Sequence, residues 1–298
     1  MKYYISFETG GTNIRFAIVG EDLSILHFHK VPTREFSAPE NAFETLCAEI
    51  EAMIRRVGRE NVIAIASSWA AMLDSDCRYL FSAPNVPGFD NFPIVDRLEE
   101  RFSLPAVIVR DCNSLLLYEM RKQALDPRGI VAGVFLGTGL GNALCINGEL
   151  YNGANGACCE LGHIPLRNVT DTCVCGKVGC AEVLCSGKVL HALAEEKYRV
   201  PITEIFRKHL DKPDVFDVVK YSADAIATEI TILDPSYTVI GGGVLSIPGF
   251  PFEEFEAEIR RNLRFPGPRH SSRLVYASGD SEAGILGATI HAMNVRKR

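Results

Sequence analysis

One histidine and three cysteines lie within eighteen residues of this chain, and they constrain the fold more than any other sequence feature. The four residues are His163, Cys173, Cys175 and Cys180. Three thiolates and an imidazole make a complete ligand set for tetrahedral Zn²⁺. Gly176 and Gly179 let the intervening chain turn back, so that all four side chains can reach one ion. Because protein fills every position, we expect a structural zinc rather than a catalytic one.

Two other interpretations of these residues are a redox-active thiol pair and a group of buried core cysteines. The glycine spacing favours the metal, because a metal-binding turn uses it and core packing does not. Folding of this loop would also fix two carboxylates, since Glu160 precedes His163 and Glu182 follows Cys180. We therefore expect a zinc-binding insertion over residues 157–187.

Length and charge narrow the class of the protein. The 298 residues are 47% hydrophobic and 23% charged, which is enough apolar material for two cores. The formal net charge of −6 argues against a nucleic-acid partner, for which a basic surface would supply most of the affinity. No apolar run approaches the roughly 20 residues that span a bilayer, and the first residues resemble a strand rather than a signal peptide. We expect a cytoplasmic protein that binds small molecules.

Strand patterns alternate with amphipathic helical patterns over the first 110 residues, which is typical of an α/β fold. The chain opens with a strand, a glycine-rich turn and a second strand, and this arrangement returns after residue 130. The two copies of the turn lie in residues 7–13 and 135–141. The sequence therefore indicates an internal duplication of an α/β block.

Three glycine-rich turns could bind phosphate groups through their backbone N–H groups. Alone, either of the first two is more often an ordinary hairpin. Together the three suggest the walls of one nucleotide site, to which the two threonines would add hydroxyl donors. The turns are Gly10-Gly11-Thr12, Gly137-Thr138-Gly139 and Gly241-Gly242-Gly243.

Two acidic residues stand where phosphoryl transfer would need them. Glu8 precedes the first turn, where a carboxylate could hold Mg²⁺ through water; the alternative is an acid at a strand end. Asp111 follows the strand at 107–110, at the edge where open α/β sheets place their ligands. It could accept a proton from an attacking sugar hydroxyl, or it could cap the helix that follows. Its position alone leaves both roles open.

Taken together, these motifs resemble the ROK family of sugar kinases, in the hexokinase–actin superfamily, over almost the whole chain. The first two turns resemble the family's phosphate motifs, the third its adenosine motif, and the run from Glu160 to Glu182 its zinc signature. The resemblance implies two ribonuclease-H-like, actin-like ATPase domains with a cleft between them. We expect one over residues 1–113 with 284–298 and the other over residues 114–283.

The resemblance also implies an activity and residue roles. The reaction would be ATP-dependent phosphorylation of a hexose hydroxyl, with ATP and Mg²⁺, a structural Zn²⁺ and a homodimeric protein. Asp111 would be the catalytic base, and Glu8 stands where the family usually has an aspartate. The implied sugar contacts are Asn85, Asp111, Glu160, His163 and Glu182.

Arg110 bears on the substrate, because glucose-specific members of the family have an asparagine before the catalytic aspartate. This pair and the zinc signature are most similar to those of the allose-specific members, so we expect D-allose to be converted to D-allose 6-phosphate. The alternatives are a kinase for N-acetylmannosamine or glucose, and a sugar-binding regulator that has lost turnover through Glu8. The seven residues before Glu8 leave no place for the helix-turn-helix of the family's repressors, so we expect a kinase.

Overall fold

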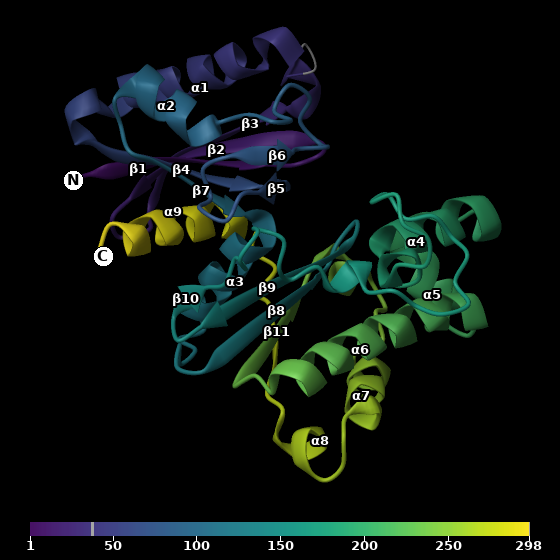
Figure 1. Ribbon diagram of the computed structural model, residues 1–298. Coiled ribbons are helices and arrows are strands. Elements are labelled where there is room, and N and C mark those ends of the chain that lie inside the picture. The colour runs from purple at the N-terminus through teal and green to yellow at the C-terminus, as the bar shows by residue number, and fades with distance from the viewer. Residues whose placement is uncertain (37–38, 298) are drawn as a thin grey trace. The chain divides into compact units, whose positions relative to one another are not determined.

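The computed structural model describes residues 1–36 and 39–297, which form two compact units (Figure 1). The first unit comprises Met1–Ala124, Asn152–Cys158 and Asp280–Arg298. The second comprises Leu125–Tyr151 and Cys159–Gly279. The α/β class and the presence of two units agree with the sequence-based expectation.

The division between the units differs from the expected one, because residues 114–124, 152–158 and 280–283, which we expected in the second unit, belong to the first. The first expected boundary lay between residues 113 and 114. That boundary falls inside helix α3 (Asp111–Lys122), which belongs entirely to the first unit. The reason is tertiary packing: α3 lies against the C-terminal helix α9 (Ala283–Val295), which is part of the same unit. A Cβ atom on Gly287 would collide with the carbonyl oxygen of Ser114, so the two helices approach more closely than larger residues allow.

The first unit is built on a five-stranded mixed sheet with the order β3-β2-β1-β4-β7. An antiparallel meander, β1 to β3, is followed by strands β4 and β7, which extend the sheet parallel to β1. The strands are β1 (Tyr3–Thr9), β2 (Asn13–Gly20), β3 (Ile25–Pro32), β4 (Val62–Trp69) and β7 (Ala106–Arg110). A short hairpin, β5 (Met72–Leu73) with β6 (Leu80–Ser82), lies outside this sheet.

The two faces of this sheet are covered by different helices. Ile5 and Phe7 are fully buried in the core that also contains residues of α1 (Ala42–Val57) and α2 (Ile94–Phe102). On the other face, the Ser6 hydroxyl lies 2.7 Å from the hydroxyl of Thr289 on α9. Figure 1 shows α1 and α2 on one side of the strands and α9 on the other. The period-2 alternation of β1 thus joins the two ends of the chain.

The second unit repeats this plan with the order β10-β9-β8-β11-β12. The β8–β9 pair is antiparallel and is joined by a glycine turn, while β11 and β12 add in parallel, as in the first sheet. The strands are β8 (Ile130–Leu136), β9 (Leu140–Ile146), β10 (Glu149–Leu150), β11 (Tyr237–Gly241) and β12 (Leu274–Tyr276). The internal duplication that the sequence indicates is therefore present in the fold.

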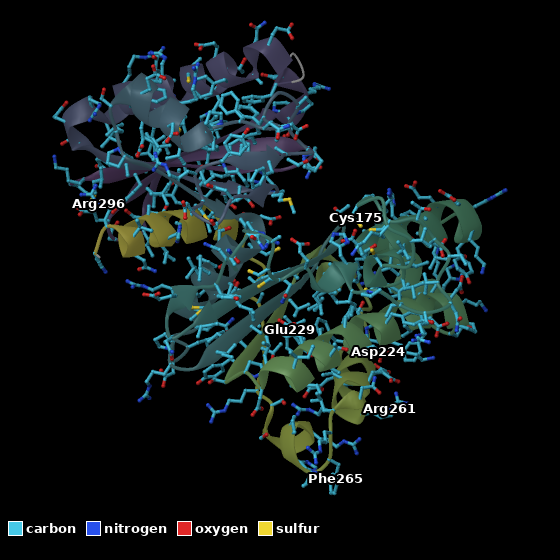
Figure 2. The ribbon with its side chains drawn as sticks, in the orientation of Figure 1. Cys175, Asp224, Glu229, Arg261, Phe265 and Arg296 are labelled. Carbon is cyan, nitrogen blue, oxygen red and sulfur yellow. The ribbon has the colours of Figure 1, made fainter. Side chains whose placement is uncertain are left out.

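The long helix α6 (Pro213–Leu233) packs on this second sheet. Its fully buried Ile226 and Ile230 share a core with Val134 of β8. Glu229, labelled in Figure 2, accepts a hydrogen bond of 3.0 Å from the Asn142 side chain, and burial raises the pKa of its carboxyl group. The other helices of this unit are α4 (Gly187–Ala192), α5 (Ile205–His209), α7 (Phe252–Asn262) and α8 (Gly267–Ser271).

Across residues 1–36 and 39–297, no helix combines the length and the apolar character needed to span a membrane.

Candidate metal centre and catalytic groups

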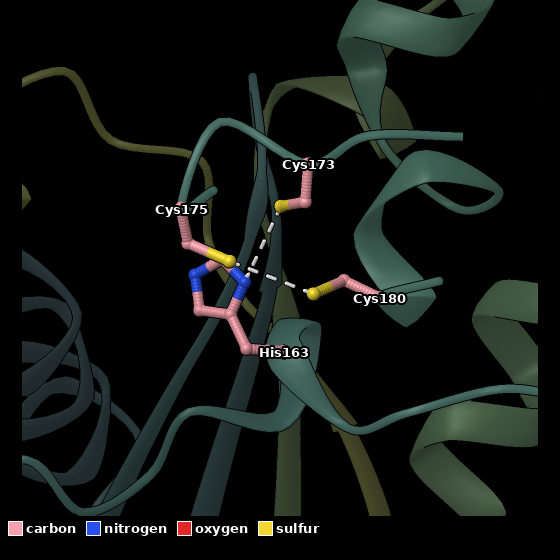
Figure 3. A group of neighbouring side chains, drawn as sticks. All are labelled: His163, Cys173, Cys175 and Cys180. Carbon is pink, nitrogen blue, oxygen red and sulfur yellow. Dashed lines mark hydrogen bonds between the residues drawn. The ribbon is translucent and has the colours of Figure 1, made fainter. Parts of the chain in front are cut away.

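The four predicted zinc ligands converge in the second unit (Figure 3). One ligand atom from each of the four residues lies within 4.8 Å of all the others. The Sγ atoms of Cys175 and Cys180 are 3.6 Å apart, and Cys173 Sγ is 3.5 Å from His163 Nδ1. Zn–S bonds of about 2.3 Å in a tetrahedron place sulfur atoms about 3.8 Å apart. The residues present therefore fit one Zn²⁺ ion, and the ligand set leaves no position open.

Backbone hydrogen bonds bring the ligands together. The Cys173 N–H donates to Lys177 O over 2.8 Å, and the Gly176 N–H donates to Cys173 O over 2.9 Å. Gly176 and Gly179 have φ values of 86° and 82°, in the left-handed region that glycine adopts most easily. The glycine spacing therefore serves the turn predicted from the sequence. At the end of the loop, the Ala181 N–H donates to Ile164 O over 3.0 Å, next to the histidine ligand.

The thiols of the cluster differ in their electrostatic surroundings. A backbone hydrogen bond from Lys177 lowers the pKa of Cys175. Burial raises the pKa of Cys180 to about 12, so this thiol stays protonated near neutral pH unless a cation is present. A bound Zn²⁺ supplies that charge, and metal binding would release the proton.

The two predicted carboxylates beside the cluster have different contacts. Glu160 Oε2 is 3.7 Å from His163 Nε2, so the histidine presents Nδ1 to the cysteines and Nε2 to Glu160. Glu182 instead accepts a hydrogen bond of 2.9 Å from the Leu140 N–H, directly after the second glycine turn. We assigned Glu182 to the sugar from the sequence, and its contact with the turn is one that sequence reasoning missed.

Asp111 is the first residue of α3 and lies at the carboxyl end of β7. The residue at the N-cap position is Arg110, not Asp111, although Asp111 Oδ1 does accept a hydrogen bond of 2.8 Å from the Cys112 N–H. Burial raises the pKa of the Asp111 carboxyl group. Arg110 donates a hydrogen bond of 2.6 Å to the Cys158 carbonyl oxygen, which holds residues 152–158 against the rest of the first unit.

Glu8 is mostly buried, with 16% of its side chain exposed, and forms an ion pair of 2.9 Å with Arg15. Burial raises the pKa of Glu8, Arg15 lowers it, and the nearby charge of Asp111 raises it. Glu8 and Asp111 are therefore close enough to interact electrostatically. Sequence reasoning missed Arg15, although the hairpin register pairs it directly with Glu8 across β1 and β2. Counting outward from the turn would have found the pair.

The first glycine turn joins β1 to β2. Its carbonyl groups are held by Thr33, whose hydroxyl donates to Gly10 O over 2.6 Å and whose N–H donates to Thr12 O over 2.9 Å. Asn85 is exposed, and its Oδ1 atom lies 3.8 Å from the position that a Cβ atom on Gly11 would occupy. The predicted sugar contact Asn85 thus lies beside the first turn.

The second and third glycine turns lie together at the carboxyl ends of neighbouring strands in the second sheet. They follow β8 and β11, which are neighbouring parallel strands. A Cβ atom on Gly242 would collide with Leu136 O, and the φ of 102° at this position also requires glycine. The structure therefore brings Gly137-Thr138-Gly139 and Gly241-Gly242-Gly243 to the same edge, as a shared ligand site would need.

Comparison with known proteins finds similarity over nearly the whole chain. The model of the ROK family matches residues 4–295. A glucokinase from Halalkalibacterium halodurans is 27% identical, covering 82% of this chain and 81% of that protein. An N-acetylmannosamine kinase from Salmonella typhi is 29% identical, covering 97% of each. A ROK family glucokinase from Streptomyces griseus, solved with glucose and AMPPNP, has a TM-score of 0.77 and 25% identity, covering 96% of this chain and 97% of that one.

We expect Cys175→Ser to lower the zinc content from about one ion per chain to a small fraction of that, because it removes one of four ligands. The free energy of unfolding of the second unit should fall by about 3 kcal/mol, since the binding energy of a structural zinc contributes directly to folding. Elemental analysis and thermal unfolding followed by circular dichroism measure the two effects.

Cys158→Ser is the matched control, because this cysteine lies outside the cluster and should leave the zinc content unchanged. Trp69, the only tryptophan, is buried in the first unit, so its fluorescence reports whether that unit stays folded in both variants. Wild-type protein that contains no zinc would contradict the metal assignment.

Proposed function

The chain belongs to the ROK family, and we propose that it is an ATP-dependent kinase that phosphorylates a hydroxyl group of a hexose. One observation carries this proposal. Glu8, near the end of β1, and Asp111, just after β7, stand at the carboxyl edge of the parallel part of the first sheet, close enough for their charges to interact. Open α/β sheets bind ligands at this edge, and phosphoryl transfer needs one carboxylate for the metal and one for the proton.

Asp111 would act as the general base. Its carboxylate would accept the proton of the sugar hydroxyl while that oxygen attacks the γ-phosphorus of ATP. The raised pKa strengthens Asp111 as a base, and the Cys112 N–H fixes the orientation of Oδ1. Catalysis by this arrangement relies on positioning and charge, because the transition state of phosphoryl transfer requires little covalent help from the protein.

The three glycine turns would hold ATP through backbone N–H groups, with the hydroxyls of Thr12 and Thr138 as additional donors. Glu8 offers the hard oxygen ligand that Mg²⁺ prefers and would hold the ion through water. The ion would offset phosphate charge. Arg15 would then share Glu8 with the metal site, because it already pairs with the same carboxylate.

The residues that we assign to the sugar are those that the family resemblance implies: Asn85, Asp111, Glu160, His163 and Glu182. A bound Zn²⁺ would hold His163 by Nδ1 and leave Nε2 for a partner such as Glu160 or a sugar hydroxyl. The metal would thus act on sugar binding indirectly, by fixing the loop that carries these groups.

The identity of the hexose is the finer part of the proposal. Arg110 next to the base led us to D-allose, but the relatives named above are a glucokinase and an N-acetylmannosamine kinase. Their names favour glucose and N-acetylmannosamine over D-allose. A homodimer, which the family resemblance implies, also remains a proposal that sedimentation analysis can test.

A second candidate is a sugar-binding regulator without turnover. The Glu8–Arg15 ion pair favours the regulator, because a carboxylate whose charge is already compensated by arginine attracts Mg²⁺ less strongly. The two candidates differ in one measurable product, ADP.

A coupled assay of ADP formation with ATP, Mg²⁺ and a sugar panel tests the proposal. We expect ADP to form with at least one of glucose, N-acetylmannosamine and D-allose, at a rate of about 1–100 s⁻¹, which is ordinary for kinases. Sugar-dependent thermal stabilisation without ADP formation would support the regulator instead. If no sugar in the panel causes either thermal stabilisation or ADP formation, both candidates are contradicted.

Asp111→Asn should lower kcat by about 10²–10⁴-fold while sugar affinity stays close to that of the wild type, because it removes the base and keeps the shape. Wild-type kcat should fall as the pH drops through the Asp111 pKa, which burial raises above the usual value, since only the ionised form accepts a proton. The residual activity of the variant should lack this fall. Asp22→Asn, at an exposed turn of the same unit, is the control and should keep the wild-type kcat. Near-normal turnover of Asp111→Asn would exclude Asp111 as the base.

Glu8→Gln should raise the Mg²⁺ concentration for half-maximal turnover by roughly tenfold, because it removes the charge and keeps the length and the contact with Arg15. A Mg²⁺ titration of initial rates measures this effect. Glu21→Gln, at an exposed position, should leave the titration unchanged. Superimposable curves for wild type and Glu8→Gln would mean that Glu8 is a strand-end acid with no part in metal binding.

A further inference from the structure

Glu182 lies in a space that two glycines leave open beside the second turn. Its Oε2 accepts the Leu140 N–H over 2.9 Å. A Cβ atom on Gly139 would collide with this same oxygen, and one on Gly162 would lie 3.3 Å from it and 2.8 Å from Leu140 O. Glycine at both positions therefore allows the carboxylate to reach the backbone of the turn.

The residues that follow Glu182 hold the other side of the same turn. The Gly187 N–H donates to Gly137 O over 2.9 Å, and the Lys188 N–H donates to Thr138 O over 3.1 Å. A Cβ atom on Gly187 would meet Gly137 O at 2.5 Å, so this approach also needs a glycine. Residues 182–188 thus bond to the turn on both its donor and its acceptor groups.

The segment 182–188 lies two residues after Cys180, one of the four predicted metal ligands. Glu182 is in a 3₁₀ turn (Ala181–Val183) in which the Val183 N–H donates to Cys180 O over 3.3 Å. Glu182 Oε1 also lies 3.9 Å from Cys173 Sγ. The position of the Glu182 carboxylate therefore depends on the loop that carries Cys173 and Cys180.

We propose that Glu182 is a positioning residue that couples the metal loop to the second phosphate turn, so that nucleotide binding depends on the cluster even without sugar. The inference rests on the proposed function and assigns Glu182 a role beyond sugar contact. Fixing the Leu140 N–H orders the adjoining turn before the ligand arrives, which removes part of the entropic cost of binding.

Calorimetric titration of the full, zinc-loaded chain with AMPPNP and Mg²⁺, in the absence of sugar, tests the coupling. Glu182→Ala should weaken AMPPNP binding by roughly tenfold, the equivalent of losing the order of about one residue. Glu182→Gln should bind nearly as the wild type, because the amide oxygen still accepts the Leu140 N–H. Glu253→Ala, at an exposed carboxylate in the first turn of α7 in the same unit, should leave AMPPNP affinity unchanged.

Hydrogen exchange of the Leu140 amide gives a readout that needs neither nucleotide nor activity. Exchange should be roughly tenfold faster in Glu182→Ala and in chelated wild-type protein, because each loses the hydrogen bond that protects this group. Chelation should also weaken AMPPNP binding to the wild type. It should add little in Glu182→Ala, where the coupling is already lost.

The outcomes separate this inference from the proposed function. Wild-type protein that binds no AMPPNP would overturn the proposed function and the inference with it. Wild-type AMPPNP affinity in Glu182→Ala, or in demetallated wild type, would overturn the inference alone. If Glu182→Ala folds poorly, Glu182→Gln provides the test. A loss of AMPPNP affinity in Glu182→Gln as large as that in Glu182→Ala would also overturn the inference, because the hydrogen bond would then not be the cause.

Discussion

The convergence of three cysteines and one histidine is the constraint on which the functional part of the second unit depends. Between β10 and α4 the chain has no α-helix or longer strand. It has the 3₁₀ turns Leu161–His163 and Ala181–Val183 and two isolated β-bridges, which pair Pro165 with Cys180 and Thr172 with Val178. Val174 and Val178 are 76% and 60% exposed, so the tip of the loop has little apolar packing to order it. Loops of this length with so little regular structure are uncommon in compact domains and are usually either functional or disordered. A Zn²⁺ ion bound by these four side chains would supply a cross-link and would fix the carboxylates on either side of the cluster.

The two units use the same hairpin, yet they place a carboxylate beside the glycine turn in different ways. In the first unit, Glu8 belongs to the hairpin itself and is paired with Arg15 on the next strand. In the second unit, Glu182 comes from the metal loop and is satisfied by the Leu140 N–H. A cation compensates the first charge and a backbone dipole the second. The duplication thus preserves the backbone of the turn while each unit has its own means of fixing it.

Local patterns were sufficient to predict the α/β class, the duplicated hairpin and the convergence of one histidine and three cysteines, because spacing and period determine these features directly. Three features depend on contacts between distant segments and could not be predicted this way. Helix α3 belongs to the first unit because Gly287 lets α9 lie against Ser114. The contact of Glu182 with the turn requires glycine at positions 139 and 162, and nothing local to Glu182 signals it. Arg15 is the intermediate case, since the hairpin register alone predicts its pairing with Glu8.

The Glu8–Arg15 pair is compatible with metal-dependent turnover. Burial raises the pKa of Glu8, and the charge of Asp111 raises it further, so an unpaired Glu8 would tend to take up a proton. A protonated carboxyl group is a poor ligand for Mg²⁺, which prefers ionised oxygen. Arg15 lowers the pKa of Glu8 and so favours its ionised form. Because Arg15 is 36% exposed, its guanidinium group can shift toward solvent and still share the Glu8 carboxylate with a divalent ion held through water. The ion pair that favours a regulator on charge alone can therefore also keep a kinase ready for its metal.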